Sequence, residues 1–252
     1  MAKYQGGADA LDALETEKGG DMEFYSLRSG SSVKVRVLGL RDLIRFRSYG
    51  IFKQINSFVA ENPSVYSDKD YPKSNLTAWD KAFNHYSELA FEEENEKVQK
   101  ELRAEGRKYL GKDRYALGFI DLETGLPIII DFSKKQAKSV HSVFKKNEKK
   151  LGNKAFEIEK SGSGTDTVVT ATSLDMDDLT DKEAKNFAKY DDKEFDMNLF
   201  DDLLYVADEK EQVELLTQAG FDVSLIGYNT TEGEGAPEGA TTGDIADDDL
   251  PF

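Results

Sequence analysis

Two segments that alternate apolar and basic residues constrain the fold of this chain more than any other feature. The stretch SSVKVRVLG (31–39) has a valine at every second position with a basic residue between, and LIRFRSYGIF (43–52) repeats the pattern. Alternation with period two indicates half-buried strands of an antiparallel sheet. We therefore expect a sheet whose outer face gathers Lys34, Arg36, Arg45, Arg47 and Tyr49.

Further along the chain, other patterns predict more strands and several helices. YALGFIDLETGLPIIIDFS (115–133) reads as two strands around a turn at 123–125, and FEIEKSGSGTDTVVTAT (156–172) as a hairpin that turns at 161–164. A helix is expected from a capping box at Ser133 and Gln136, with lysines opposite its apolar face. Other expected helices cover 87–108, 180–190, 199–207 and 209–219.

This order of elements predicts a mainly β fold with added helices (α+β), built on a five-stranded Greek-key barrel of the OB type. We expect an acidic N-terminal arm at 1–22, then a core at 23–174 with an insertion at about 60–112. An acidic helical region at 175–227 follows, and a disordered linker with a terminal tip at 228–252.

Charge is distributed unevenly along the chain. The net charge is −16, but residues 166–252 carry 24 acids against 5 bases, whereas segment 28–55 has seven bases against one acid. Such asymmetry suggests a nucleic-acid binder with an acidic tail. OB barrels bind single strands through a basic groove and aromatic platforms. The expected DNA-binding residues are Lys34, Arg36, Arg45, Arg47, Tyr49, Phe52, Lys53, Tyr71, Lys73 and Trp79.

Each of these signals also has a structural interpretation. Alternating bases are often a solvated strand face, aromatic residues are more often core than stacking platforms, and the lysines of 134–150 are typical of a solvated helix surface. The concentration of bases around Tyr49 favours a binding groove.

Several classes of function and site find no support in the sequence. There is no cysteine, only two histidines are present, and neither a glycine-rich phosphate loop nor a nucleophile elbow occurs, so we expect neither an enzyme nor a cofactor or metal site. No segment has the pattern of a signal peptide or a membrane span, which leads us to expect a cytoplasmic protein without a membrane partner.

The chain ends in GDIADDDLPF, where three acids precede an apolar residue, proline and phenylalanine. The acids can bind a basic rim on a partner protein, and the terminal aromatic side chain with its carboxylate can fill a pocket beside that rim. The expected docking residues are Asp247, Asp248, Asp249, Leu250, Pro251 and Phe252. This ending resembles the acidic tip of bacterial single-stranded DNA-binding proteins.

The body, from LETGLPIIIDFSKKQ to FEIEKSGSGTDTVVTAT, is similar to phage single-stranded DNA-binding proteins related to the T-even helix-destabilising protein. The resemblance implies an OB fold, nonspecific binding of single strands, and an acidic C-terminus that contacts replication and recombination proteins of the polymerase, helicase, primase or nuclease class. It also implies the cytoplasm of a bacterial host. The T-even protein has a zinc-bearing subdomain, and since this chain lacks the ligands, the 60–112 insertion is expected to be metal-free.

Two other functions stay open at this point. An acidic scaffold or nucleic-acid mimic would use the negative surface to bind basic partners and would have no affinity for single strands. A strand-annealing recombination protein would instead speed the pairing of complementary strands.

Overall fold

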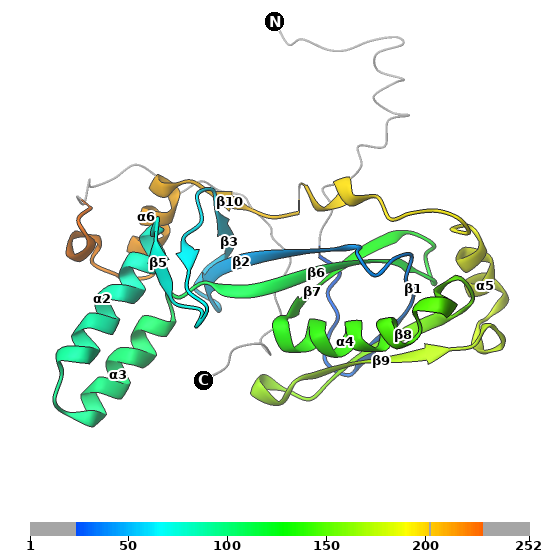
Figure 1. Cartoon of the computed structure of the whole chain (residues 1–252), viewed down its shortest axis with the longest axis horizontal. Coiled ribbons are helices and arrows are strands. Elements are labelled where there is room, and N and C mark those ends of the chain that lie inside the picture. The colour runs from blue at the N-terminus through cyan, green and yellow to red at the C-terminus, as the bar shows by residue number, and fades with distance from the viewer. Residues whose placement is uncertain (1–23, 202, 229–252) are drawn as a thin grey trace, which may run out of the picture.

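A large, mainly antiparallel sheet with helices packed on it forms the body of the protein (Figure 1). The structure is a computed structural model that describes residues 24–201 and 203–228. The expected N-terminal arm and the acidic docking tip therefore lie outside the described residues. The α+β class is confirmed. The eight-stranded sheet has no pairing, within those residues, that closes it into a barrel.

The strands of the main sheet run in the order β10-β3-β2-β6-β1-β8-β9, with β7 also paired to β6. Their bounds are Ser31–Arg36 (β1), Leu43–Ile51 (β2), Ile55–Ala60 (β3), Lys112–Asp121 (β6), Pro127–Ser133 (β7), Ala155–Ser161 (β8), Val168–Leu174 (β9) and Val206–Ala207 (β10). A separate two-stranded hairpin joins Val65–Tyr66 (β4) to Pro72–Ser74 (β5).

The sheet branches at β6. One edge of β6 pairs with β7 along most of its length. The other edge pairs first with β2, from Ser48 opposite Lys112 to Leu43 opposite Leu117, and then with β1 at Val35 opposite Asp121. Strands β1 and β2 therefore follow one another along a single edge of β6.

Five α-helices and several short 3-10 turns complete the described chain. The α-helices are Ala78–Glu92 (α2), Glu96–Arg107 (α3), Lys134–Lys146 (α4), Asp181–Ala188 (α5) and Glu209–Gln218 (α6). The 3-10 turns are Glu148–Asn153 (η1), Gly164–Asp166 (η2), Met176–Asp178 (η3), Met197–Phe200 (η4) and Val223–Ile226 (η5).

Two helix predictions were wrong. The single helix expected over 87–108 is two helices, because the chain turns at Glu93 and Asn95 caps the second by accepting from the backbone N–H of Lys97 and Val98. The helix expected over 199–207 is a 3-10 turn followed by the short strand β10, which pairs in parallel with β3.

Predictions from helix-capping residues and glycine turns were confirmed. The capping box of Ser133 and Gln136 opens α4, and a second box at Thr180 and Glu183 opens α5. The turn between β6 and β7 places Gly125 at φ +74°, where a residue without Cβ is favoured. The hairpin β8–β9 turns where the glycine-rich stretch predicted it.

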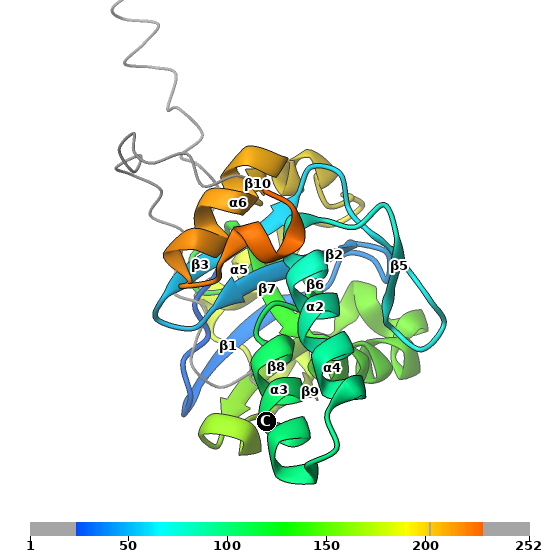
Figure 2. The same ribbon diagram turned by 90° about the vertical axis from the view of Figure 1, so that its left-hand side faces the viewer.

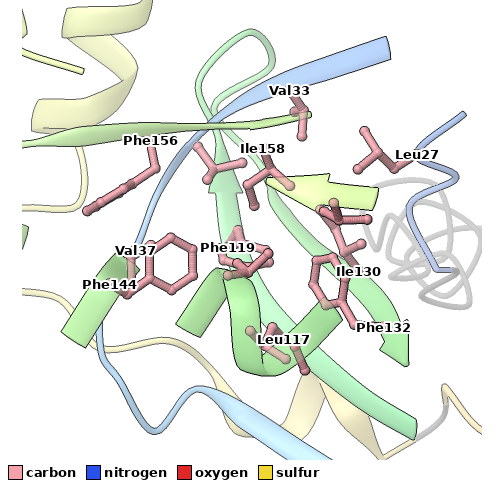
Figure 3. Packing of buried hydrophobic residues seen from close by; sticks show 14 residues of the cluster. Leu27, Val33, Val37, Leu117, Phe119, Ile130, Phe132, Phe144, Phe156 and Ile158 are labelled. Carbon is pink, nitrogen blue, oxygen red and sulfur yellow. The ribbon is translucent and has the colours of Figure 1, made fainter. Parts of the chain in front are cut away.

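One face of the sheet carries two hydrophobic cores. The first core lies under α4, whose Val140 and Phe144 pack on Phe119, Phe156 and neighbouring side chains (Figure 3). The second core lies at the end of the sheet formed by β2 and β3, where α2 and α6 cover it (Figure 2).

The acidic segment that follows β9 covers the opposite face of the sheet. Phe195, Phe200 and Leu203 pack on Ala116, Ile120 and Ile129, and Phe187 of α5 packs on Leu122 and Ala155. Residues of the expected acidic helical region at 175–227 thus pack on the sheet. Tyr228, the first residue of the expected linker, packs against the second core.

Candidate nucleic-acid interface

The bases of β1 and β2 do not lie together, which corrects the central site prediction. Val33 and Val35 of β1 point into the first core, so Lys34 and Arg36 lie on the opposite face. In β2 the apolar residues point the other way, because Ile44 and Phe46 pack on the opposite face of the sheet. Arg45 and Arg47 therefore share a face with the valines of β1, and the two basic pairs are on opposite sides of the sheet.

Lys34 and Arg36 are engaged by α5 and the residues after it. The ammonium of Lys34 is 3.1 Å from the carboxylate of Glu183. Arg36 is buried, its guanidinium 4.1 Å from the centre of the Phe187 ring, and it donates to the carbonyl of Phe187 and, at 2.8 Å, to Asp191. The prediction that these two bases share one outer face with Arg45 and Arg47 was therefore wrong.

Two of the aromatic residues expected to stack on bases, Tyr49 and Trp79, are core residues instead. Tyr49 is buried against Phe58, with ring centres 5.4 Å apart, and Trp79 is fully buried with its indole N–H donating to the carbonyl of Gln212 at 3.1 Å. Neither ring is accessible to a base, because the fold needs both to fill the second core.

A buried carboxylate, Asp80, fixes the loop between β3 and α2 onto the sheet. It accepts hydrogen bonds from the hydroxyls of Tyr49 at 2.7 Å, Tyr66 at 2.6 Å, Ser64 at 2.5 Å and Thr77 at 3.1 Å. Burial, followed by the negative charge of Asp80, raises the pKa of Tyr49. Burial is also the largest cause that raises the pKa of Tyr66, so both phenols stay neutral donors at physiological pH.

A charged cluster lies next to this loop, around the carboxylate of Asp113 on β6. Asp113 is nearly inaccessible, and three cations approach it: Arg45 at 2.7 Å, Arg47 at 2.9 Å and Lys134 at 3.8 Å. We call these four residues the Asp113 cluster. The cluster has an excess of positive charge at its exposed edge, since the side chains of Arg45 and Lys134 are 58% and 69% exposed.

Arg47 is the internal member of the Asp113 cluster. Its guanidinium lies 3.6 Å from the centre of the Tyr66 ring and donates to the carbonyl of Gly111 at 2.7 Å and to Asp70. Only 10% of its side chain is exposed. Burial opposes its charge, but the hydrogen bond and charges of its partners outweigh burial and raise its pKa. Arg47 therefore positions Asp113 and the loop and is not a contact for a ligand.

The basic surface continues from the Asp113 cluster along α4. The helix buries Ala137, Val140 and Phe144, which turns its lysines outward. Lys134 and Lys138 are one helical turn apart on the same exposed side. In the described part of the chain, Lys138 has no acidic oxygen within 4.0 Å. Arg45, Lys134 and Lys138 thus form a row of accessible cations, which we call the cation row.

The remaining candidates are exposed and lie on two loops. Phe52, in the turn between β2 and β3, is partly exposed with the ammonium of Lys53 4.8 Å from its ring centre. Tyr71 is 58% exposed and stacks on Phe83 with ring centres 6.2 Å apart, and Lys73 is exposed on β5. These four residues keep the accessibility that a stacking or phosphate contact needs.

No family model, curated protein or solved structure matches this chain.

Sequence reasoning missed Asp113 and did not place the α4 lysines in the site. In the sequence, nothing distinguishes Asp113 from the other acids. Its contact with Arg45 and Arg47 becomes visible only once β2 and β6 pair with Arg47 opposite Asp113. The lysines did give a signal, their spacing on one side of an expected helix. Residues 247–252 lie outside the described part of the chain, so the docking tip stays a prediction.

Neither a metal site nor a membrane helix occurs in the described residues. No group of three or more histidine or acidic side chains within 24–201 and 203–228 is arranged to hold a metal ion. None of the helices in those ranges is long and apolar enough to cross a bilayer.

Proposed function

We propose that this protein binds single-stranded DNA without sequence specificity, through a β core of the OB type, and protects and organises that strand in phage replication and recombination. The observation that carries the proposal is the cation row, three accessible bases in line on the sheet and α4 of a chain whose net charge is −16. The net negative charge of the chain repels a polyanion, so a nucleic acid can bind only where bases are locally concentrated, as they are in the cation row.

The proposed path replaces the one expected from the sequence. Arg45, Lys134 and Lys138 contact phosphates, and the exposed rings of Tyr71 and Phe52 stack on bases. Arg45 suits a phosphate because one nitrogen of its guanidinium donates to Asp113, while the side chain stays 58% exposed and has further N–H groups to donate. Lys34, Arg36, Arg47, Tyr49 and Trp79 have structural roles and are withdrawn from the path.

Titration of labelled oligo-dT at several salt concentrations tests this function. Each phosphate contact on a single strand contributes about −0.7 to the log–log salt slope, so three contacts give about −2. Lys138→Ala should make the slope shallower by about 0.7, while Lys182→Ala, an exposed lysine of α5 paired with Glu123, should leave it unchanged. Absence of oligo-dT binding at low salt would refute the function and favour the acidic scaffold.

We further propose that the ending DDDLPF docks on replication or recombination proteins. Phe252→Ala should remove those partners from a pull-down without changing oligo-dT affinity or thermal stability. Identical partner profiles for both chains would show that the terminal phenylalanine is not recognised.

A further inference from the structure

The tip of the α2–α3 hairpin combines an exposed aromatic side chain with dense negative charge. Phe91, at the end of α2, is 87% exposed, and Leu89 beside it is also exposed. Residues 88–96 contain five glutamates and no base. The hairpin extends away from the sheet, at the lower left of Figure 1, with its tip far from α4.

Packing within the hairpin does not account for Phe91. The two helices pack on each other, and Ala90 is the buried residue of the last turn of α2. In the described chain, Glu88, Glu92 and Glu94 form no ion pair. Single exposed apolar residues are common, but an aromatic ring in water surrounded by unpaired acids has the composition of a docking element.

A complementary surface lies at the far end of α4. Four of the six residues at 145–150 are lysines, and all four are exposed. None of them has an acidic oxygen within 4.0 Å among residues 24–201 and 203–228. Val143 and Leu151 lie partly exposed beside them, at the edge of the first core. Partly exposed apolar side chains and lysine stems offer an aromatic ring an apolar contact within a basic rim.

We propose that the hairpin tip of one copy docks on the lysine cluster 145–150 of a second copy, with Phe91 against Val143 and Leu151. Charge complementarity selects this occupant, since one chain presents both the acidic element and the basic one. The two surfaces are different parts of the molecule, so the contact is head-to-tail. Each added copy leaves one free tip and one free cluster, so the assembly grows until the rotation between copies closes it into a ring.

This inference does not use the cation row, because residues 145–150 are distinct from Arg45, Lys134 and Lys138. Sedimentation velocity of the full chain without DNA tests the self-association separately from the proposed DNA binding. We expect the average mass to rise with protein concentration at low salt and to fall when salt is added, because the contact is between opposite charges. A monomer at every concentration would overturn the proposal.

Substitutions locate the contact. Phe91→Ala should weaken self-association about 30-fold, as for an aromatic residue at the centre of an interface. Leu225→Ala, at an apolar residue of η5 that is also exposed, is the control and should associate like the parent chain. Equal association of all three chains would overturn the role of the tip.

Charge reversal then identifies the partner surface. Glu92→Lys with Glu94→Lys should abolish association, as should Lys145→Glu with Lys149→Glu, and combining all four substitutions in one chain should restore it. If each pair abolishes association and the combined chain stays monomeric, the tip does not dock on 145–150. Circular dichroism on every variant controls for folding, and affinity for a short oligo-dT reports separately on the proposed DNA function.

Discussion

Replacing Asp113 with asparagine should strengthen DNA binding while it weakens the fold. Asp113 holds Arg45 at 2.7 Å and lies 3.8 Å from Lys134, so a phosphate bound by both cations is about 6 Å from its carboxylate. At an effective dielectric constant of about 40, repulsion at that distance costs about 1.4 kcal/mol. Asp113→Asn removes this repulsion, and we expect oligo-dT to bind about tenfold more tightly at low salt.

The same substitution should lower the free energy of unfolding. Arg47 is nearly buried and loses a charged partner, although it keeps Asp70 and the carbonyl of Gly111. A lost charge-assisted hydrogen bond at such a site costs about 1–3 kcal/mol. Urea denaturation measures this change, and fluorescence anisotropy of labelled oligo-dT measures the affinity.

A matched control lies on the other face of the sheet. Asp131 of β7 is as buried as Asp113 and pairs with Arg114 at 2.7 Å, next to the core on which Phe195 packs. Asp131→Asn should destabilise the fold by a similar amount and leave oligo-dT affinity unchanged. If Asp113→Asn folds but binds no more tightly than the parent chain, Arg45 and Lys134 do not contact the strand.

Three further outcomes are expected. Gly118→Ala would place a Cβ 2.4 Å from the ring of Phe195. We expect urea denaturation to show that the free energy of unfolding falls by about 1–3 kcal/mol. Unchanged stability would mean that the ring moves freely. Trp79 is fully buried, so its fluorescence should not respond to saturating oligo-dT and should resist quenching by acrylamide; a large response would place it on the DNA path. Burial raises the pKa of Tyr109 to about 12, above an unfolded value of about 10. The stability that this phenol contributes is therefore present below pH ~10 and lost as the pH rises toward ~12. Phenolate absorbance during alkaline unfolding measures this loss. Ionisation of Tyr109 at pH ~10 without unfolding would contradict the prediction.

The sequence predicted the strands of the core because alternation is a property of each strand by itself. It did not predict which faces the strands share, since that depends on pairing. Val35 and Arg45 point to the same side because both lie opposite odd-numbered residues of β6, Asp121 and Tyr115. One strand thus presents its apolar set and the next its basic set to that side. Nothing within either segment specifies which of its two sets of side chains will face that side of the sheet.

The roles of the aromatic residues Tyr49 and Trp79 were equally undetermined by the sequence. Tyr49 and Trp79 have an apolar body and one polar atom, which suits a wet platform and a hydrogen-bonded core alike. Asp80 and the carbonyl of Gln212 supply the buried partners, and Gln212 lies far along the chain from Trp79. Helix caps were predictable because their hydrogen bonds join residues three positions apart.

The parallel pairing of β10 with β3 has a consequence for how the chain folds during synthesis. Val206 lies opposite Val59, and Leu216 and Phe221 close the core over Phe58 and its neighbours. Contacts between segments this far apart in sequence form late, because a long loop must close first. While the ribosome is still adding residues beyond β9, the β2–β3 end of the sheet has no cover from α6, and its aromatic surface is open to chaperones or to aggregation. A host with fewer free chaperones should therefore yield less soluble protein, even though the finished fold is unaffected.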